Sequence, residues 1–435
     1  MNMNDIIFKK RIGQELSEPE INFFIDGYTN GEIPDYQASA LLMAIMFQKL
    51  SMEETVCLTE AMKSSGDLVD LSAIHGIKVD KHSTGGVGDK TTLVVGPIAA
   101  ACGVPIAKMS GRGLGFTGGT VDKMESIPGM KTTMESDDFI KQVNEIGLAV
   151  IGQTGHIAPA DKKLYALRDV TATIDNLSLI SASIMSKKLA AGADAILLDV
   201  KCGSGAFMKT RAEAVALAEM MVSIGTLSDK KTVAAVTDMS QPLGLAVGNA
   251  LEVMEAIHTL KGEGPSDITE LSLHLAGIMI YIGRKADSPE HGKQLATDAI
   301  DNGTALEKFS QFVTYQGGNP KITVNESLFP EAKFRVELKA REAGYVGSID
   351  ANIIGLASQH TGAGRTVMGE EIDMSAGILL HKKVGDFVNA GECIASIQGR
   401  NELKVKSGLN ECERAFEIQQ VSPQKHKLIY DIIGI

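Results

Sequence analysis

The sequence lacks tryptophan, has only five cysteines and carries no excess of positive charge. The cysteines are scattered, odd in number and never spaced as CxxC, so we expect free thiols in a reducing compartment and neither a disulfide framework nor a zinc site. The formal net charge of −12 argues against nucleic acid or an anionic membrane as a partner, because both select basic surfaces.

Long apolar runs are also missing. The first eleven residues do not lead into the apolar stretch of a signal peptide. The longest uncharged run, residues 91–107, is shorter than the ~20 residues that span a bilayer and is interrupted by Gly96, Gly103 and Pro105. We therefore expect a cytoplasmic protein of two or three domains, since 435 residues with 44% hydrophobic and 22% charged side chains are ordinary for a globular chain.

Two glycine-rich loops, residues 83–88 and 110–120, dominate what the sequence does contain. Glycine allows positive φ and close approach to a ligand, and successive N–H groups with neighbouring hydroxyls form anion-binding concavities. Residues 81–123 hold five Lys or Arg against two Asp or Glu, so this stretch is locally positive. Neither loop matches the P-loop GxxxxGK[ST] pattern, but together they predict a site for a phosphate dianion.

The order of the patterns predicts how the chain is divided. Capping boxes at Ser17 and Glu20 and at Ser51 and Glu54 indicate an all-helical start. Apolar strand-like runs, including residues 195–200, follow later, and the last hundred residues alternate in the manner of strands. We expect a mixed parallel α/β domain, a discontinuous helical domain and a C-terminal α+β module. The expected boundaries are 1–66 and 161–193 for the two helical parts, 67–160 and 194–335 for the two α/β parts, and 336–435 for the module.

The local pattern places each glycine-rich loop between a strand and a helix. Residues 67–80 lead into a strand before the first loop, and residues 93–107 predict a helix after it. Residues 105–109 then predict a strand before the second loop. A loop that follows a strand and opens a helix is the usual setting of an anion site.

Three further groups are candidates for chemistry. His82 lies inside the first loop, where it either transfers a proton or contacts phosphate and backbone without exchanging one. Ser183 and Lys187 are four residues apart and share a helix face, whose apolar flanks suggest partial burial. Arg168 needs a turn of the chain to join them, and each of these polar groups has the alternative of being solvated surface.

Residues 110–125, SGRGLGFTGGTVDKME, resemble the signature of thymidine and pyrimidine-nucleoside phosphorylases. KHSTGGVGD at 81–89, YALRDVT at 165–171, SIMSKK at 183–188 and QPLGLAVGN at 241–249 support the resemblance, which covers essentially the whole chain. AKMS at 107–110 is more similar to the broad-specificity pyrimidine-nucleoside branch than to the strict thymidine branch.

The resemblance implies reversible phosphorolysis of uridine, thymidine or deoxyuridine to the base and (deoxy)ribose 1-phosphate, with inversion. It implies no organic cofactor, a homodimer formed through the helical domain, and domain closure over hinges near 67–80, 155–163 and 190–195. The residues that match phosphate positions are Lys81, Ser83, Thr92, Lys108, Met109, Ser110 and Thr120. Those that match pyrimidine positions are Tyr165, Arg168, Ser183 and Lys187, with His82, Arg168 and Lys187 expected to act in catalysis.

Relatives of the broad-specificity branch also carry a cation, which the resemblance implies to be potassium or calcium. The matching positions are Gly88, Lys90, Leu243, Ala246 and Glu255. Position 90 departs from the pattern, because close relatives often have threonine there and this chain has an ammonium group. Phe116 also replaces a histidine common in the family.

Three alternatives stay open from the sequence. One is a strict thymidine phosphorylase. The second is an anthranilate-type phosphoribosyltransferase, which shares the architecture and would require phosphoribosyl pyrophosphate and magnesium. The third is a non-catalytic nucleoside-binding protein, which would show no turnover.

Overall fold

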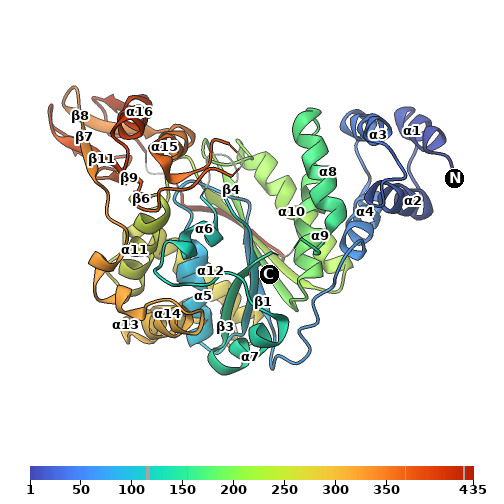
Figure 1. Ribbon diagram of the computed structural model, residues 1–435, viewed down its shortest axis with the longest axis horizontal. Helices are drawn as coiled ribbons and strands as arrows, with labels where there is room; N and C mark the ends of the chain where they lie inside the picture. Colours follow the sequence, from blue (N-terminus) through green and yellow to red (C-terminus); the bar gives the residue numbers. More distant parts are fainter. Residues whose placement is uncertain (114–117, 154, 368, 425–426) are drawn as a thin grey trace.

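The computed structural model describes residues 1–113, 118–153, 155–367, 369–424 and 427–435. A helical part lies at one end, a C-terminal α+β part lies at the other, and an α/β part with a central sheet lies between them (Figure 1). The predicted fold class is confirmed. Among the described residues we find no helix that is long and apolar enough to cross a membrane.

The helical part is built from two separate stretches of chain. Its helices are α1 (Met3–Arg11), α2 (Glu18–Thr29), α3 (Asp35–Gln48), α4 (Met52–Ser64), α8 (Pro159–Val170) and α9 (Leu177–Ala190). Both predicted capping boxes are present, at the N-termini of α2 and α4. One apolar core joins the stretches, because Leu164 of α8 and Leu179 of α9 pack with residues of α1–α4. In Figure 1, α8 and α9 lie between α1–α4 and the sheet.

The central sheet has the strand order β1 (Val79–Ser83), β4 (Ala195–Cys202), β5 (Lys231–Asp238) and β13 (Ile429–Ile433). The first three strands are parallel, and β13 returns antiparallel beside β5, so the end of the chain belongs to this sheet. All eight residues of β4 are buried, as a strand covered on both faces requires. Because Ser83 pairs with Asp199, the carboxyl end of β1 lies beside the middle of β4.

A second parallel pair, β2 (Ile106–Ser110) and β3 (Leu148–Gly152), carries the second glycine-rich loop. The helix predicted over residues 93–107 is α5 (Thr91–Ala101) and ends earlier than expected, because Gly103 adopts φ +82° and Pro105 cannot continue a helix. The other helices of the α/β part are α6 (Thr120–Glu125), α7 (Ser136–Ile146), α10 (Arg211–Leu227), α11 (Asn249–Leu260), α12 (Ser266–Ile282), α13 (Pro289–Asp301) and α14 (Thr304–Tyr315).

The C-terminal part contains two small antiparallel sheets. One has the order β10 (Phe387–Val388), β8 (Gly344–Ile349) and β12 (Phe416–Gln419). The other has the order β6 (Ala246–Val247), β9 (Gly377–Leu380), β11 (Cys393–Gly399) and β7 (Phe334–Lys339). Helices α15 (Ala351–Ser358) and α16 (Glu402–Cys412) accompany them. Since β6 comes from the α/β part, this edge strand joins the C-terminal part to the segment that precedes α11.

The segments that connect the helical part to the α/β part are joined to one another by backbone hydrogen bonds. The N–H of Asp67 donates to the carbonyl of His156 at 2.9 Å, and the N–H of Val69 donates to the carbonyl of Ala190 at 2.9 Å. The three segments expected to act as hinges therefore lie together. A relative movement of the two parts would bend all three at one place.

The helical part contains a buried ion pair whose loss we expect to be costly. Lys10 donates to both carboxylate oxygens of Glu54 at 2.8 Å, and both side chains are buried. Lys10→Met leaves a buried carboxylate without its cation, so urea unfolding followed by circular dichroism should show a loss of about 3–5 kcal/mol. Lys406→Met breaks an exposed pair with Glu402 and should change stability by less than about 1 kcal/mol. Equal, small losses in both variants would contradict this account.

Candidate active site

Strand β1 divides the site into two faces, because successive side chains of a strand point to opposite sides. Lys81 and Ser83 contact the loop and helix that follow the strand. Asp80 contacts β2 and α9 on the other side. One five-residue strand thus supplies side chains both to the expected phosphate site and to the helical part.

The first face is a network of buried lysines and carboxylates. The ammonium of Lys81 donates to Oγ1 of Thr91 at 2.5 Å and lies 3.1 Å from Oδ2 of Asp199. Lys201 lies 2.8 Å from the same oxygen. Burial alone would lower the pKa of Lys201, but Asp199 and Asp89 raise it. The network therefore keeps this lysine charged.

Asp89 closes this face beside the first glycine-rich loop. Its carboxylate accepts bonds from the hydroxyls of Ser83 and Thr91, each at 2.5 Å, and from the N–H of Thr91 at 3.2 Å. Burial would raise the pKa of Asp89, but the charges of Lys81 and Lys201 hold it well below its usual range. The carboxylate is ionised and holds in place the hydroxyl of Ser83.

The second face is centred on Asp80, which lies between two buried ammonium groups. Oδ1 accepts from Lys108 at 3.2 Å and Oδ2 accepts from Lys188 at 2.8 Å. Burial alone would raise the pKa of Asp80, but Lys108 and Lys188 lower it to about 2. Burial lowers the pKa of Lys108 to about 8, with Lys188 and Lys81 adding to the effect and Asp80 opposing it. The charge of Lys108 is therefore sensitive to mildly alkaline pH.

The charges of the two faces do not cancel. The four ammonium groups are Lys81, Lys108, Lys188 and Lys201, and the three carboxylates are Asp80, Asp89 and Asp199. One positive charge remains in a buried setting, where its effect on an anion is screened less than it would be at the surface. The cluster is thus suited to an anionic ligand.

His82 is a neutral imidazole at physiological pH. Burial lowers its pKa well below the usual value, and the positive charges of Lys188 and Lys108 lower it further. Its Nε2 atom is buried and has no hydrogen-bond partner among the described residues. A buried polar atom without a protein partner is an expected contact for a ligand, and a neutral ring would meet that ligand by hydrogen bonding.

Lys187 brings part of the expected pyrimidine site together. Its ammonium pairs with Asp161 of α8 and donates to Oγ of Ser183 at 3.2 Å. Its side chain is 26% exposed, whereas the neighbouring Lys188 points into the protein and pairs with Asp80. Two consecutive lysines of α9 therefore have different tasks, because adjacent helical residues face about 100° apart.

Arg168 is buried, and its side chain contacts backbone carbonyls. Its guanidinium donates to the carbonyls of Thr173, Ile174 and Leu179 at 2.7–3.2 Å, and it holds the turn between α8 and α9. The guanidinium carbon lies 5.9 Å from the centre of the Tyr165 ring. The four expected pyrimidine residues thus form two pairs, one on α8 and one on α9.

The remaining expected phosphate residues follow the first loop or border the second. Thr92 lies in the first turn of α5 and is half-buried, Met109 and Ser110 end β2, and Thr120 begins α6. The carbonyl of Met109 accepts a bond from Lys188 at 3.3 Å. The loop positions 114–117, with Phe116, lie outside the described residues.

The sequence did not identify the carboxylates that hold the lysines. Asp80, Asp89, Asp161 and Asp199 each pair with a lysine or hydroxyl of the site, and the sequence pattern indicated no role for Lys188 or Lys201. A weak signal was present, since Asp80 and Asp89 flank the first loop and a buried lysine requires a partner.

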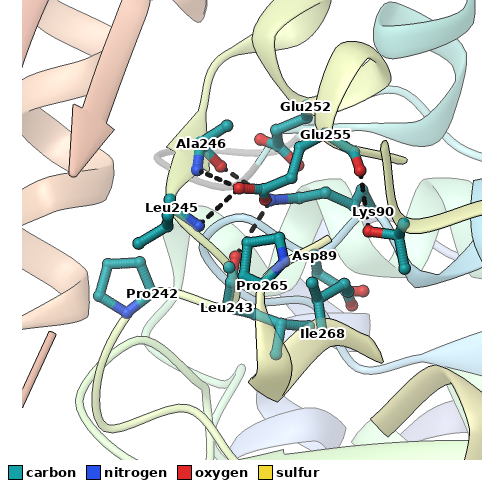
Figure 2. A network of polar contacts seen from close by, with 12 residues as sticks. Asp89, Lys90, Pro242, Leu243, Leu245, Ala246, Glu252, Glu255, Pro265 and Ile268 are labelled. Carbon is teal, nitrogen blue, oxygen red and sulfur yellow. Dashed lines mark hydrogen bonds and ion pairs between the residues drawn. The ribbon is translucent and has the colours of Figure 1, made fainter. Parts of the chain in front are cut away.

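The positions that the resemblance matched to a cation site lie close together, but their oxygens already accept hydrogen bonds from the ammonium group of Lys90 (Figure 2). Lys90 Nζ donates to the carbonyls of Leu243 at 3.0 Å and Ala246 at 2.9 Å, and it pairs with Glu255. Gly88 borders the same oxygens, because a Cβ built on it would lie 2.5 Å from the Leu243 carbonyl. These residues do not fit a free ion as they stand, since the lysine fills the place where it would lie.

Three family models match this chain. They are the glycosyl transferase family helical bundle domain over residues 4–66, the glycosyl transferase family a/b domain over 75–306, and the pyrimidine nucleoside phosphorylase C-terminal domain over 345–419.

Full-length relatives agree with the models. A pyrimidine-nucleoside phosphorylase of Staphylococcus haemolyticus is 57% identical over 96% of both chains, and one of Geobacillus stearothermophilus is 54% identical over 100% of both. The solved anthranilate phosphoribosyltransferase of Thermus thermophilus shares the fold, with a TM-score of 0.58 at 19% identity, and the likeness covers 72% of this chain and 99% of that one. With its full-length relatives and all three domain models in agreement, this chain belongs to the pyrimidine-nucleoside phosphorylase family.

Proposed function

We propose that the protein catalyses reversible phosphorolysis of pyrimidine nucleosides, namely uridine, thymidine and deoxyuridine, giving the free base and (deoxy)ribose 1-phosphate. The names of the full-length relatives support the reaction class. The observation that carries the proposal is the division of β1 into two faces. One face has donors suited to a phosphate, and the other has a neutral His82, near the lysines of α9, whose Nε2 has no partner in the described part of the chain.

In the proposed reaction, a phosphate oxygen forms a bond to C1′ of the sugar while the bond from C1′ to the base nitrogen breaks. The bonding electrons leave with the base, and the sugar passes through a cationic state. Lys81 and Ser83 would bind the phosphate by exchanging their present carboxylate partners for its oxygens, since both already lie at the loop with their protons directed to anions. No protein nucleophile is needed.

The charge that grows on the departing base needs donors where it develops. Lys187 is the partly exposed ammonium on the helical side, and His82 can donate or accept one hydrogen bond as a neutral ring. Three of the five N–H groups of Arg168 donate hydrogen bonds to carbonyls, so two remain that can donate to a base oxygen. Lys187 and Arg168 would thus act on the base, with His82 as a hydrogen-bonding partner.

The proposed phosphate and base residues lie on different parts of the molecule, so catalysis requires the parts to close on each other. We place the hinge where the segments that connect the two parts bond to one another, near Asp67, His156 and Ala190.

All five cysteines are free thiols, which agrees with a cytoplasmic location.

A homodimer through the helical part belongs to the same proposal. Tyr36, Met43 and Phe47 are 74%, 38% and 79% exposed and lie at i, i+7 and i+11 of α3, so they form one apolar stripe. An apolar stripe of this kind is a typical contact between subunits.

We expect release of uracil from uridine and of thymine from thymidine, in each case only with phosphate. Lys187→Ala should lower kcat/KM by about 10²–10³-fold, as removal of one donor to a developing anion does elsewhere. Lys162→Ala, at an exposed position on α8, is the control and should keep full activity. Release without phosphate would indicate a hydrolase, and release from thymidine alone would indicate a strict thymidine phosphorylase. A requirement for phosphoribosyl pyrophosphate and magnesium would favour the transferase whose fold is shared.

The ammonium of Lys108 donates to the carbonyl of Lys81 as well as to Asp80, so it borders the phosphate face, and its pKa of about 8 predicts a pH dependence for phosphate binding. The ammonium form prevails below that pH and is lost above it, so the KM for phosphate should rise roughly fivefold from pH 8 to pH 9 if this one proton controls binding. Lys108→Met should bind phosphate weakly, with a KM that is flat over the same range. A rising KM in this variant would assign the titration to another group.

The apolar stripe predicts the oligomeric state. Replacing both Tyr36 and Phe47 by Glu should convert a dimer to a monomer in analytical ultracentrifugation, because charges would have to be buried at the contact. Tyr315→Glu, at an exposed position on α14, should leave the mass unchanged. A wild-type protein that sediments as a monomer would contradict the proposed contact.

A further inference from the structure

We propose that the side chain of Lys90 is a tethered cation that takes the place of a metal ion at the junction of the first glycine-rich loop, α11 and the C-terminal sheet, so that the protein needs no monovalent metal ion there. The inference concerns stability as well as activity, and it does not depend on which nucleoside is the substrate.

The number of donors matches the number of acceptors. An ammonium group has three N–H donors. Around Lys90 Nζ lie three acceptors, which are the carbonyls of Leu243 and Ala246 and the carboxylate of Glu255 (Figure 2). The Lys90 side chain is 0% exposed, so water does not compete for these acceptors. Two carbonyls and a carboxylate are also the hard oxygen donors that alkali and alkaline-earth ions prefer.

The backbone around the Lys90 ammonium has a conformation that accommodates a buried charge. One oxygen of Glu255 pairs with Lys90, and the other accepts the N–H groups of Leu245 at 2.7 Å and Ala246 at 3.1 Å. Gly244 adopts φ +70°, and a Cβ on it would lie 3.1 Å from Lys90 Nζ and would collide with the Glu255 carboxylate. Residues 243–246 therefore turn tightly about one buried ion pair.

The ammonium joins three parts of the protein. Lys90 directly precedes Thr91, whose hydroxyl accepts from Lys81. Ala246 begins β6, which pairs with β9 of the C-terminal part, and Glu255 lies in α11. A loss of the cation would thus loosen the loop that holds the expected phosphate residues.

A second lysine strengthens the same contact one helical turn away. Lys123 Nζ lies 2.8 Å from Glu252 of α11 and donates to the carbonyl of Asp89 at 2.7 Å. Two buried lysines therefore bind residues 89 and 90 to the same face of α11, because positions 252 and 255 are three apart. Since both cations are covalently part of the chain, their occupancy does not depend on the ions in solution.

Shortening Lys90 would leave the cage accessible to ions. A cavity of about 810 Å³ is lined by Leu245, Ala246 and Glu255, among others, so solvent reaches the border of the cage. Lys90→Thr removes the ammonium and supplies a hydroxyl oxygen. Because the threonine side chain is shorter, it also leaves space for potassium. Lys90→Met removes the charge but fills the space.

The test compares thermal unfolding and nucleoside cleavage in potassium chloride and in tetramethylammonium chloride of equal ionic strength. Wild type should give the same melting temperature and rate in both. Lys90→Thr should melt lower than wild type in tetramethylammonium and should recover by about 3–5 °C in saturating potassium, as a ligand that binds only the folded state does. Lys90→Met should melt lower in both salts, without recovery.

Lys10→Met is the matched control, because it also leaves a buried glutamate without its lysine, but in the helical part. It should melt lower and show no response to potassium. The measurement on the wild-type protein tests the proposal even if the Lys90 variants fail to fold. If potassium stabilises or activates the wild-type protein, the proposal is wrong. It would also be overturned if Lys90→Met were as stable as wild type, or if Lys90→Thr failed to respond to potassium. Melting is read without turnover, so the result stands apart from that of the proposed reaction.

Discussion

The ion triad of Asp80 with Lys108 and Lys188 joins the three elements on which the site depends. Asp80 lies on β1, Lys108 on β2 and Lys188 on α9, so one buried carboxylate connects the central sheet, the second strand pair and the helical part. Its cost of burial is offset because two cations meet it at hydrogen-bonding distance. Removing Lys188 would break the ion pair between β1 and α9, and removing Lys108 would break the one between β1 and β2.

The same pairing of a lysine with a carboxylate recurs at three other places near the site. Lys81 has Asp199, Lys187 has Asp161 and Lys90 has Glu255. Each carboxylate holds an ammonium group in place before any ligand arrives, which lowers the reorganisation that binding would require. The price is a low tolerance for substitution, because removal of one member leaves the other as a buried, unpaired charge.

The sequence predicted the fold class, the split helical part and the strand–loop–helix setting of the first loop, because capping boxes and apolar periodicity are local signals. It could not predict that β13 returns to β5, since pairing between residues near 235 and near 432 leaves no local trace. The helix predicted after the first loop also ran beyond Gly103, whereas the observed helix ends at Ala101. The carboxylate partners were missed for the same reason, because Asp80 and Lys188 are brought together only by the tertiary fold. Lys90 was noted as a departure from the family pattern, but only the structure places its ammonium among the oxygens.

The most direct measurement is a crystal structure of the protein grown with phosphate and a pyrimidine nucleoside. The account predicts phosphate oxygens at about 3 Å from Lys81 Nζ and Ser83 Oγ, on one face of β1. It predicts the base on the other face, within hydrogen-bonding distance of His82 Nε2 and Lys187 Nζ. Phosphate bound away from Lys81 and Ser83, or a base that contacts neither His82 nor Lys187, would contradict the division of the site by β1.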